Sequence, residues 1–337
     1  MSENVIDQIV SELRANGAQW YPEMGELRAV RTVGHTPKSD HYIYDLVINF
    51  ENGNERLAVK LYRAGKGGHA RTMAAAETAH LHSVWNQTRT EPLLGIPRPI
   101  GDFSALGAVV SEKLAGFPLQ SLIMKAALLP GYAGLGVLQN AAAASGAWLC
   151  QFQKATARPA KPLDRDGLQA DIEKLCNKCK SVGLDDMSVS KILSTVGSIL
   201  NQSREPLMNS AVLNEFTPLS VAVLDRGVGF SDFARMQEDG STYTDSATFL
   251  ASVEVLEKYP FCNRSITTEV QERFLDAYGA TEEEREILQV VKMKILLSMF
   301  AAGRTVPESA LRKKVMWANV MKKFIQAVAD RSTPKAA

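Results

Sequence analysis

The chain has 337 residues and a formal net charge of +1, and 45% of its residues are hydrophobic and 22% charged. This is the composition of a globular protein with one large or two medium domains. The balanced charge gives no general signal for a nucleic-acid partner or an anionic membrane. The first residues, MSENVIDQIV, carry early acidic residues and no apolar core, so they do not predict a secretory signal.

The cysteines favour a reducing, cytoplasmic environment. There are four of them, scattered along the chain, and Cys176 and Cys179 form a Cys-x-x-Cys pair inside a helical pattern. A zinc or redox site would need further ligands, but no second pair exists and all five histidines lie at or before residue 82. We therefore expect two reduced thiols one helical turn apart.

The first half of the chain predicts a helix followed by a small sheet. Residues 1–25 have apolar residues at helical spacing, and the pattern changes to strands after Pro22. Asn52-Gly53-Asn54 is typical of a hairpin turn between the second and third strands. The expected elements are, in order, strands at ELRAVRTV, HYIYDLVINF and RLAVKLYR, a helix at ARTMAAAETAHLHSVWNQ, and short strands at PRPIGDF and GAVVSEKL.

The second half predicts mainly helices. The alanine-rich segment 138–158 forms a strong helix that ends before Pro159, and two more helices cover about 166–202. Residues 206–233 interrupt them with short β-branched runs on either side of an Asp-Arg-Gly turn, and helices then continue to the end. The apolar segment ILQVVKMKILLSMFAAG contains two lysines, which predicts a buried helix rather than a membrane span. The class is α+β.

A strand lysine and a helix glutamate form the first pair of candidate site residues. On the third strand Lys60 alternates with Leu57, Val59 and Leu61, so it lies on the opposite face. Glu77 is the one acidic residue of the helical run that follows. Each has an alternative interpretation, as a solvent-exposed lysine on an open sheet and a helix-surface glutamate. Together they reproduce the ion pair that holds nucleotide phosphates in kinases.

Two further segments follow in a matching order. In SEKLAGFPL, residues 111–119, a strand ends in a small loop whose backbone, at Glu112, is placed to meet an adenine ring. The alternative is a plain strand–loop–helix junction. Asp232-Phe233-Ala234 follows a short strand, where the Asp232 carboxylate is able to reach a metal ion bound to phosphates.

With these segments in this order, the chain resembles the aminoglycoside phosphotransferase/choline kinase-like family of the protein-kinase-like superfamily, from about residue 25 to 300. The resemblance implies a two-lobed kinase-like fold, with a nucleotide-binding lobe of one antiparallel sheet and one main helix at 1–115 and a helical lobe at 116–337. It implies ATP between the lobes, Mg²⁺ on Asp232, and Asp245 as a brace of the catalytic loop. The resemblance rests on LAVKLYR, AAAETAHL, SEKLAGFPL, SGAWLCQFQKATARP, FTPLSVAVL, VGFSDFARM and GSTYTDSATFL.

The catalytic loop departs from the family pattern of histidine, glycine or arginine, aspartate, then four residues and asparagine. The matching positions are Leu213, Asn214, Glu215 and Ser220. Glu215 keeps a carboxylate that is longer by one methylene, and a misplacement of about 1 Å costs about a hundredfold in rate. Ser220 offers a second metal ion only a hydroxyl, and Leu213 cannot hydrogen-bond as the histidine does.

The phosphate-binding loop is also unusual. VGHTPKSDHY has one glycine, Gly34, where protein kinases have three. Backbone amides, Ser39 and Lys38 remain as candidate phosphate contacts, and the alternative for Lys38 is a solvated loop lysine.

Two functional outcomes are therefore open. In one, the chain transfers the γ-phosphoryl group of ATP to a hydroxyl of a small molecule, with Glu215 as the base and a metal on Asp232. In the other, it is a pseudokinase that binds nucleotide, or nothing, and acts as a scaffold for a protein partner. Positioning and charge stabilisation dominate phosphoryl transfer, which keeps the first outcome open. The sequence does not specify the acceptor.

The C-terminal segment is a competing site of another class. Residues 308–330 form a basic amphipathic pattern, with apolar residues flanked by lysines. Such a helix binds a partner or a membrane surface, or it packs on the large lobe with its lysines in water; we favour the packed helix. The residues of the pattern are Val315, Val320, Met321 and Phe324 with Lys313, Lys314, Lys322 and Lys323.

Overall fold

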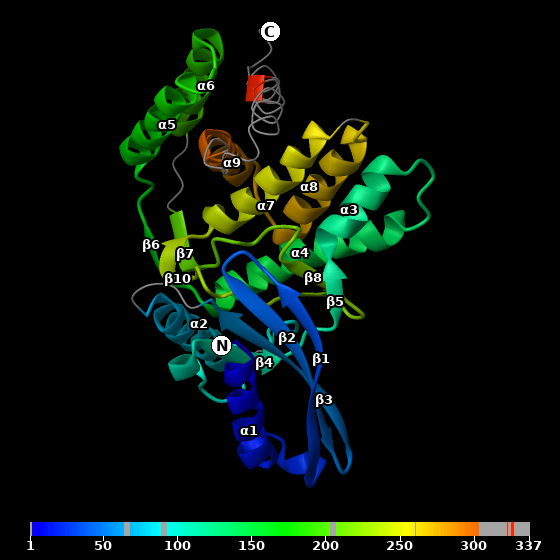
Figure 1. The fold of residues 1–337 in the computed structure, drawn as a ribbon. Coiled ribbons are helices and arrows are strands. Elements are labelled where there is room, and N and C mark those ends of the chain that lie inside the picture. The colour runs from blue at the N-terminus through cyan, green and yellow to red at the C-terminus, as the bar shows by residue number, and fades with distance from the viewer. Residues whose placement is uncertain are drawn as a thin grey trace. The chain divides into compact units, whose positions relative to one another are not determined.

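The computed structural model describes residues 2–63, 68–88, 93–202, 207–259, 261–302, 322 and 325–326. The chain forms two compact units (Figure 1). The first unit comprises Met1–Gly116 together with Gly229–Met236, and the second comprises Phe117–Val228 and Gln237–Ala337. The segment Gly229–Met236 thus belongs to the first unit although it follows much of the second along the chain.

The first unit contains a four-stranded antiparallel sheet in the order β1-β2-β3-β4. β2 and β3 pair from His41↔Tyr62 to Phe50↔Gly53, so their hairpin closes over residues 51–52, slightly before the predicted turn. The strand predicted at 97–103 does not form, and only a single bridge joins Pro99 to Ser111. Prolines lack the N–H that a strand donates, which explains this error. The strands are β1 (Leu27–Pro37), β2 (His41–Phe50), β3 (Gly53–Tyr62) and β4 (Ala108–Glu112).

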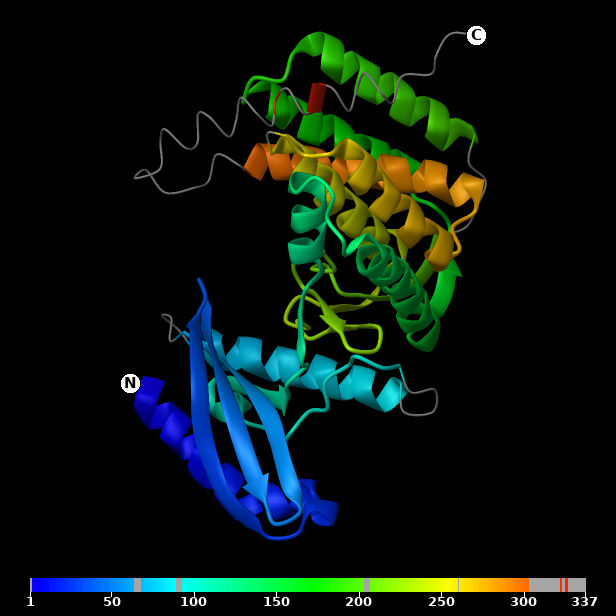
Figure 2. The ribbon, with the colours of Figure 1, turned by 90° about the vertical axis from the view of Figure 1, so that its right-hand side faces the viewer.

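Two helices pack on this sheet, one on each face. α1 (Ser2–Trp20) packs Ile9 and Leu13 into one core with Leu57, Val59 and Leu61 of β3. α2 (His69–Gln87) contacts β3 through the residues that alternate with these three (Figure 2). The alternation predicted for the third strand is therefore present, and it directs Lys60 away from the hydrophobic core under α1. Short 3-10 turns lie at η1 (Pro22–Met24) and η2 (Ser104–Leu106).

The second unit is mainly helical. α5 and α6 lie side by side and α9 packs against them, around a core that contains Cys176, Cys179 and Leu297 (Figure 1). The helices that the sequence predicted over 138–158, 166–202 and the late apolar segment are present, although the first of them ends at Ala155 and a strand begins at Arg158. The helices are α3 (Leu119–Leu128), α4 (Leu135–Ala155), α5 (Arg165–Lys180), α6 (Asp186–Gln202), α7 (Tyr243–Val255), α8 (Arg264–Tyr278) and α9 (Glu282–Ala302), with a 3-10 turn at η3 (Leu256–Lys258).

Short strands also occur in the second half, and the sequence predicted only the two that flank the Asp-Arg-Gly turn. β6 (Arg158–Lys161) and β10 (Gln237–Ser241) flank β7 (Leu207–Val212) in an antiparallel sheet. Their sequences, RPAK and QEDGS, are polar and lack the β-branched runs on which the prediction relied. β8 (Val221–Leu224) and β9 (Val228–Phe230) flank the predicted Asp-Arg-Gly turn, and β5 (Gly116–Pro118) is shorter.

The two lysines of the apolar helix α9 both form ion pairs with acidic residues of neighbouring helices. Lys292 is buried and pairs with Glu254 of α7 at 2.6 Å, and Lys294 pairs with Asp171 of α5 at 2.6 Å. Among the described residues, no helix is both long and apolar enough to cross a membrane.

Most of the predicted C-terminal basic helix lies outside the described residues. Within 308–330 only 322 and 325–326 are described. Ile325 is fully buried in the core with α5, α6 and α9, and Gln326 hydrogen-bonds Asp185. These two residues pack within the second unit, and the rest of the interpretation of this segment stays a prediction.

Candidate functional site

Lys60, Glu77 and Asp232 meet within the first unit. The Lys60 ammonium donates to Glu77 Oε1 at 3.0 Å and to Asp232 Oδ1 at 2.9 Å. Glu77 is almost fully buried, whereas the Asp232 side chain is 42% exposed. The structure therefore brings together three residues that were singled out separately in the sequence, although 172 positions separate Lys60 from Asp232.

Tyr62 belongs to the same network and was not predicted. Its hydroxyl donates to Glu77 Oε2 at 2.6 Å, and Lys60 Nζ lies 5.2 Å from the centre of its ring. The signal was available, because Tyr62 shares the face of the strand with Lys60. A tyrosine at this spacing has many structural uses, however, so only the contact identifies its partner. We call Lys60, Tyr62, Glu77 and Asp232 the lysine network.

The charges of the lysine network follow from its burial. Burial opposes the charge of Lys60, but Glu77 and Asp232 outweigh it and raise the pKa of this lysine. Burial raises the pKa of Glu77, against the effect of Lys60 and the Tyr62 hydroxyl. Burial and the negative Glu77 raise the pKa of Tyr62 far above its ordinary value, so its hydroxyl remains a donor. The network thus holds one cation between two carboxylates.

The segment that carries Asp232 is fixed from two sides. His80 of α2 lies 3.0 Å through Nδ1 from the carbonyl oxygen of Phe233, which requires the proton on that nitrogen. Phe230 and Phe233 are both fully buried and meet edge to face at 5.4 Å. Asp232 is thus held at the surface by buried neighbours.

The loop between β1 and β2 is held by Arg63 at the end of β3. Arg63 donates from its side chain to the carbonyl oxygen of Lys38 and from its backbone N–H to that of Asp40, and its guanidinium lies 4.5 Å from the ring of Tyr42. Ser39 is exposed, and its hydroxyl donates to Asp40 at 3.3 Å. Ser39 as a phosphate contact stays a prediction.

Glu112 lies at the end of β4 and contacts the α1 side of the unit. Its carboxylate accepts from Tyr21 at 3.1 Å and lies 3.8 Å from Arg98, and its backbone N–H donates to the Arg98 carbonyl oxygen at 2.9 Å. That N–H is therefore committed within the first unit. An adenine contact at Glu112 stays a prediction, and only its carbonyl oxygen is a candidate for it.

In the second unit, Asp245 holds the loop segment, residues 213–220. Asp245 lies in the first turn of α7 and is fully buried, and its carboxylate accepts from the backbone N–H groups of Leu213 at 2.7 Å and Asn214 at 2.8 Å. Burial raises the pKa of Asp245 to about 7, and the two amide hydrogen bonds oppose this. Asn214 has φ +62°, a conformation that glycine and asparagine tolerate.

Ser220 uses its hydroxyl within the loop segment. The hydroxyl hydrogen-bonds the Glu215 carbonyl oxygen and accepts from the Thr217 N–H at 3.0 Å. It is a structural hydroxyl in this conformation, and its predicted role as a metal ligand stays a prediction. Glu215 itself is partly exposed on this loop segment.

Aromatic stacking fixes the middle of the loop segment. Phe216 is fully buried and stacks on Trp148 of α4 with ring centres 5.6 Å apart and planes 6° apart. On its other side it meets Phe249 of α7 at 5.9 Å, and Phe249 stacks on Phe274 of α8 at 4.2 Å. Buried rings of three helices therefore hold the backbone beside Glu215.

The cysteine pair lies in the hydrophobic core of the second unit. Cys176 and Cys179 are free and buried, and burial raises their pKa values to about 11 and about 12. Thiols with such values are unreactive at neutral pH. No cluster of three or more metal-ligating side chains occurs among the residues that the structure describes.

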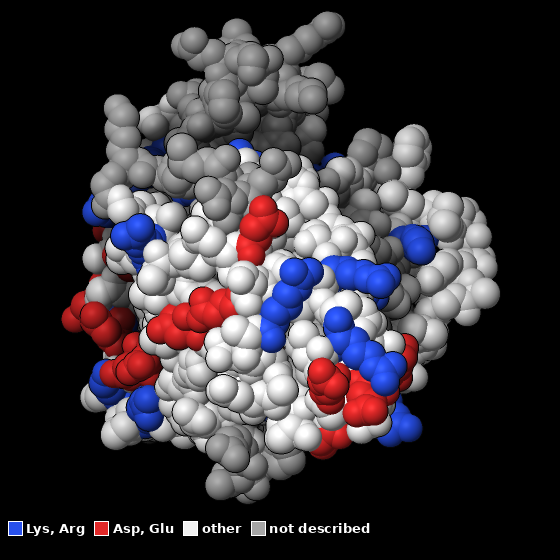
Figure 3. Space-filling view, turned by 60° about the horizontal axis from the view of Figure 1, so that its bottom comes forward, with Lys and Arg blue, Asp and Glu red and all other residues white. Residues whose placement is uncertain are grey.

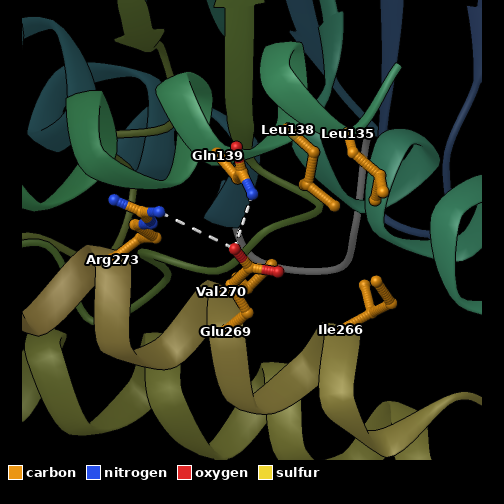
Figure 4. Close-up of a pocket in the computed structure, with 7 residues that line it drawn as sticks. All are labelled: Leu135, Leu138, Gln139, Ile266, Glu269, Val270 and Arg273. Carbon is orange, nitrogen blue, oxygen red and sulfur yellow. Dashed lines mark hydrogen bonds and ion pairs between the residues drawn. The ribbon is translucent and has the colours of Figure 1, made fainter. Parts of the chain in front are cut away.

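A small hollow between α4 and α8 of the second unit does not involve the candidate residues. Glu269 at its wall accepts from Gln139 at 2.5 Å and lies 3.8 Å from Arg273 (Figure 4). The polar groups there satisfy one another. Its lining is Leu135, Leu138, Gln139, Ile266, Glu269, Val270 and Arg273.

The surface charge is mixed, as the net charge of +1 implies. Figure 3 shows basic and acidic side chains interspersed on the face that it draws. On this face the described charges therefore neutralise one another locally.

Comparison with solved structures identifies the architecture. No family model matches the sequence, and no curated protein matches it. The chain is similar to a glucosamine kinase in complex with glucosamine, ADP and inorganic phosphate, with 13% identity, coverage of 92% of this chain and 96% of that chain, and a TM-score of 0.55. It has a protein-kinase-like fold. The α+β, two-lobed class predicted from the sequence is thus confirmed.

Two further kinase-like structures support this conclusion. Spectinomycin phosphotransferase in complex with ADP and spectinomycin shares 10% identity over 97% of this chain and 98% of its own, with a TM-score of 0.52. An aminoglycoside phosphotransferase from Alicyclobacillus acidocaldarius shares 13% identity over 89% and 91%, with a TM-score of 0.51. At these identities the likeness establishes the kinase-like fold.

Proposed function

We propose that the chain binds ATP and transfers its γ-phosphoryl group to a hydroxyl of a small molecule. The observation that carries the proposal is the meeting of Lys60, Glu77 and Asp232 at one ammonium group. A buried carboxylate that fixes a lysine beside an exposed carboxylate is the arrangement that kinases use to hold phosphates and their metal ion. The kinase-like fold supports the same function.

Each network residue has one role in this proposal. Lys60 orients the ATP phosphates, and Glu77 fixes Lys60. Asp232 provides the oxygen ligand that magnesium prefers, and its partly exposed carboxylate fits such a ligand. Magnesium, when bound, neutralises phosphate charge. Because Lys60 contacts Asp232 in the structure, we expect this ion pair to weaken when the carboxylate takes up a metal ion.

Glu215 acts on the acceptor in the second unit. A bond forms between the acceptor oxygen and the γ-phosphorus, and the bond from that phosphorus to the β,γ-bridging oxygen breaks and leaves ADP. Glu215 positions the acceptor hydroxyl and takes its proton. Phosphoryl transfer makes little demand on base strength, so the altered carboxylate reduces the rate and keeps the reaction.

The test begins with nucleotide binding. Thermal unfolding is measured with ATP, with and without magnesium, for wild type, Lys60→Ala and Lys113→Ala; Lys113 pairs with Asp45 in the same unit at 2.5 Å. We expect ATP with magnesium to raise the melting temperature of wild type and Lys113→Ala and to leave Lys60→Ala unchanged. Wild type without a shift would overturn the proposal.

Transfer is then tested by ADP formation. Glucosamine and spectinomycin occur in the similar structures, so the acceptor panel contains amino sugars, aminocyclitols and aminoglycosides. We expect acceptor-dependent ADP formation that Glu215→Ala reduces by about a hundredfold or more. ATP binding should be equal in both proteins.

A second candidate function is a pseudokinase that binds nucleotide and acts as a scaffold. It is favoured by the loop segment, where Leu213 is a buried apolar residue and the Ser220 hydroxyl is bonded inside the loop. ATP binding without ADP formation for any acceptor, and equal behaviour of Glu215→Ala, would select this function over the first.

A further inference from the structure

The second oxygen of Glu77 has its own donor. Lys60 bonds Oε1 at 3.0 Å and the Tyr62 hydroxyl bonds Oε2 at 2.6 Å. Glu77 is 1% exposed, so water does not serve either oxygen in place of a protein donor. An ionised carboxylate in this position therefore depends on both residues of β3.

Packing fixes the position of the Tyr62 hydroxyl. The ring is 5% exposed and lies between the Lys60 ammonium, 5.2 Å from its centre, and the ring of His41 at 6.0 Å. Tyr62 follows Lys60 by two positions on the same strand, so both donors face α2 from one rigid element. The packed ring therefore holds the Tyr62 hydroxyl where it donates to Glu77.

The charges around Glu77 make this donor important. Lys60 is the cation in contact with it, from β3, and Asp232 on the segment Gly229–Met236 competes for the same ammonium at 2.9 Å. Asp232 raises the pKa of Glu77 by repulsion, and Asp40 beyond Tyr62 adds a more distant negative charge. Tyr62 is the donor in this group that Glu77 does not share with Asp232.

We propose that Tyr62 is a positioning residue that keeps Glu77 ionised and oriented, so that Lys60 remains fixed on Glu77 when Asp232 takes up a metal ion. This inference deepens the proposed nucleotide site and rests on it. Tyr62 acts through Glu77 and Lys60 without contact with the phosphates.

The inference gives a pH dependence with a definite sign. Without the hydroxyl, the pKa of the buried Glu77 rises further, because one stabilising donor of its charged form is lost. Glu77 then takes up a proton at higher pH than in wild type, and Lys60 loses Glu77 as an anionic partner while Asp232 remains beside it. In Tyr62→Phe, ATP affinity therefore falls as the pH is lowered, at pH values where the wild-type affinity is still constant.

The first measurement needs no nucleotide. Infrared difference spectra report the carbonyl band of a protonated carboxyl group. Asp245 gives such a band in wild type and in every variant as the pH is lowered from about 8 to about 6. We expect a further band to appear in Tyr62→Phe at higher pH than in wild type, and this further band to be missing from Tyr62→Phe/Glu77→Gln. A further band that appears at the same pH in Tyr62→Phe and wild type would overturn the inference.

The second measurement is the ATP dissociation constant across the same pH range. We expect Tyr62→Phe to bind ATP within about threefold of wild type at about pH 8 and more weakly than wild type at about pH 6, with a loss of at most about tenfold per pH unit. Tyr44→Phe is the matched control, because Tyr44 is a buried tyrosine of the neighbouring strand that packs on His35. It should follow wild type at both pH values, and an equal pH dependence in both variants would overturn the inference.

A third variant changes the hydroxyl in the opposite direction. Tyr62→3-fluorotyrosine keeps the ring and makes the hydroxyl a stronger donor, so the protonation of Glu77 should move to lower pH than in wild type. A shift to higher pH, or none, contradicts the inference even if Tyr62→Phe folds poorly. The infrared result decides the role of Tyr62 toward Glu77 by itself, whereas wild type that fails to bind ATP at every pH overturns the proposed function.

Discussion

The lysine network of the first unit and the loop segment of the second unit are held in place in different ways. In the first unit, the side chains of Lys60, Tyr62, Glu77 and Asp232 bond one another directly. In the second unit, Asp245 and Ser220 hold the loop segment by its backbone amides and carbonyls. A substitution in the first region therefore removes a partner from other side chains, whereas a substitution at Asp245 or Ser220 removes a partner from the backbone.

The largest expected effect on stability comes from breaking the side-chain network. Lys60→Met leaves Glu77 buried without its cation, and we expect a loss of roughly 3 kcal/mol in the free energy of unfolding, measured by urea denaturation. Lys113→Met is the control, because its ion pair with Asp45 is partly exposed and is worth about 1 kcal/mol or less. Equal losses in the two variants would show that the lysine network has no special role in stability.

Removing the contacts of Asp245 with the backbone of the loop segment should reduce the free energy of unfolding by nearly as much. Asp245→Ala leaves the N–H groups of Leu213 and Asn214 buried without their acceptor, and we expect a loss of roughly 2–3 kcal/mol. Asp245→Asn keeps one acceptor oxygen and should lose less. If Asp245→Ala unfolds at the wild-type urea concentration, Asp245 does not hold the loop segment.

The pH dependence of stability separates Asp245 from other carboxyl groups. Burial raises its pKa to about 7 in the folded state, from about 4 in the unfolded state. Between these values the folded state binds more protons, so the stability that Asp245 contributes falls as the pH rises from about 4 to about 7, by roughly 1 kcal/mol per pH unit. The difference in unfolding free energy between wild type and Asp245→Asn should follow this slope and become flat above pH 7. A difference that does not change with pH would contradict it.

The smallest expected effect concerns Ser220. Ser220→Ala removes the hydroxyl that bonds the Glu215 carbonyl oxygen, and we expect a loss of about 1 kcal/mol with unchanged ATP affinity at every magnesium concentration. If ATP binding by Ser220→Ala instead requires more magnesium, the hydroxyl is a metal ligand, as the sequence predicted.

The fold and part of the candidate site were predictable because strand alternation and the order of motifs are visible in the sequence. Contacts that depend on side-chain packing are not visible there. Strand alternation placed Lys60 opposite Leu57, Val59 and Leu61, and the order of motifs indicated the kinase-like fold. The partner of Glu77 Oε2 was not predictable, since the rotamer of Tyr62 depends on packing against His41 and Lys60. The polar strands β6 and β10 were missed because they form by pairing with β7 and have no apolar pattern of their own.

The same reasoning applies to Ser220 in the loop segment. By the resemblance, Ser220 lies where the family pattern has asparagine. The sequence alone does not decide whether its hydroxyl binds a metal ion or hydrogen-bonds a backbone carbonyl oxygen. Its choice depends on the turn between Glu215 and Thr217, which only the folded chain defines.

The central claim is that the lysine network holds the nucleotide independently of the altered catalytic loop. Isothermal titration calorimetry of ATP with magnesium tests it most directly in wild type, Lys60→Met and Glu215→Gln. We expect Glu215→Gln to bind within about twofold of wild type and Lys60→Met to bind at least about tenfold more weakly, a difference of about 1.4 kcal/mol or more. Wild type that binds no ATP, or binding that is lost in Glu215→Gln and kept in Lys60→Met, would contradict the account.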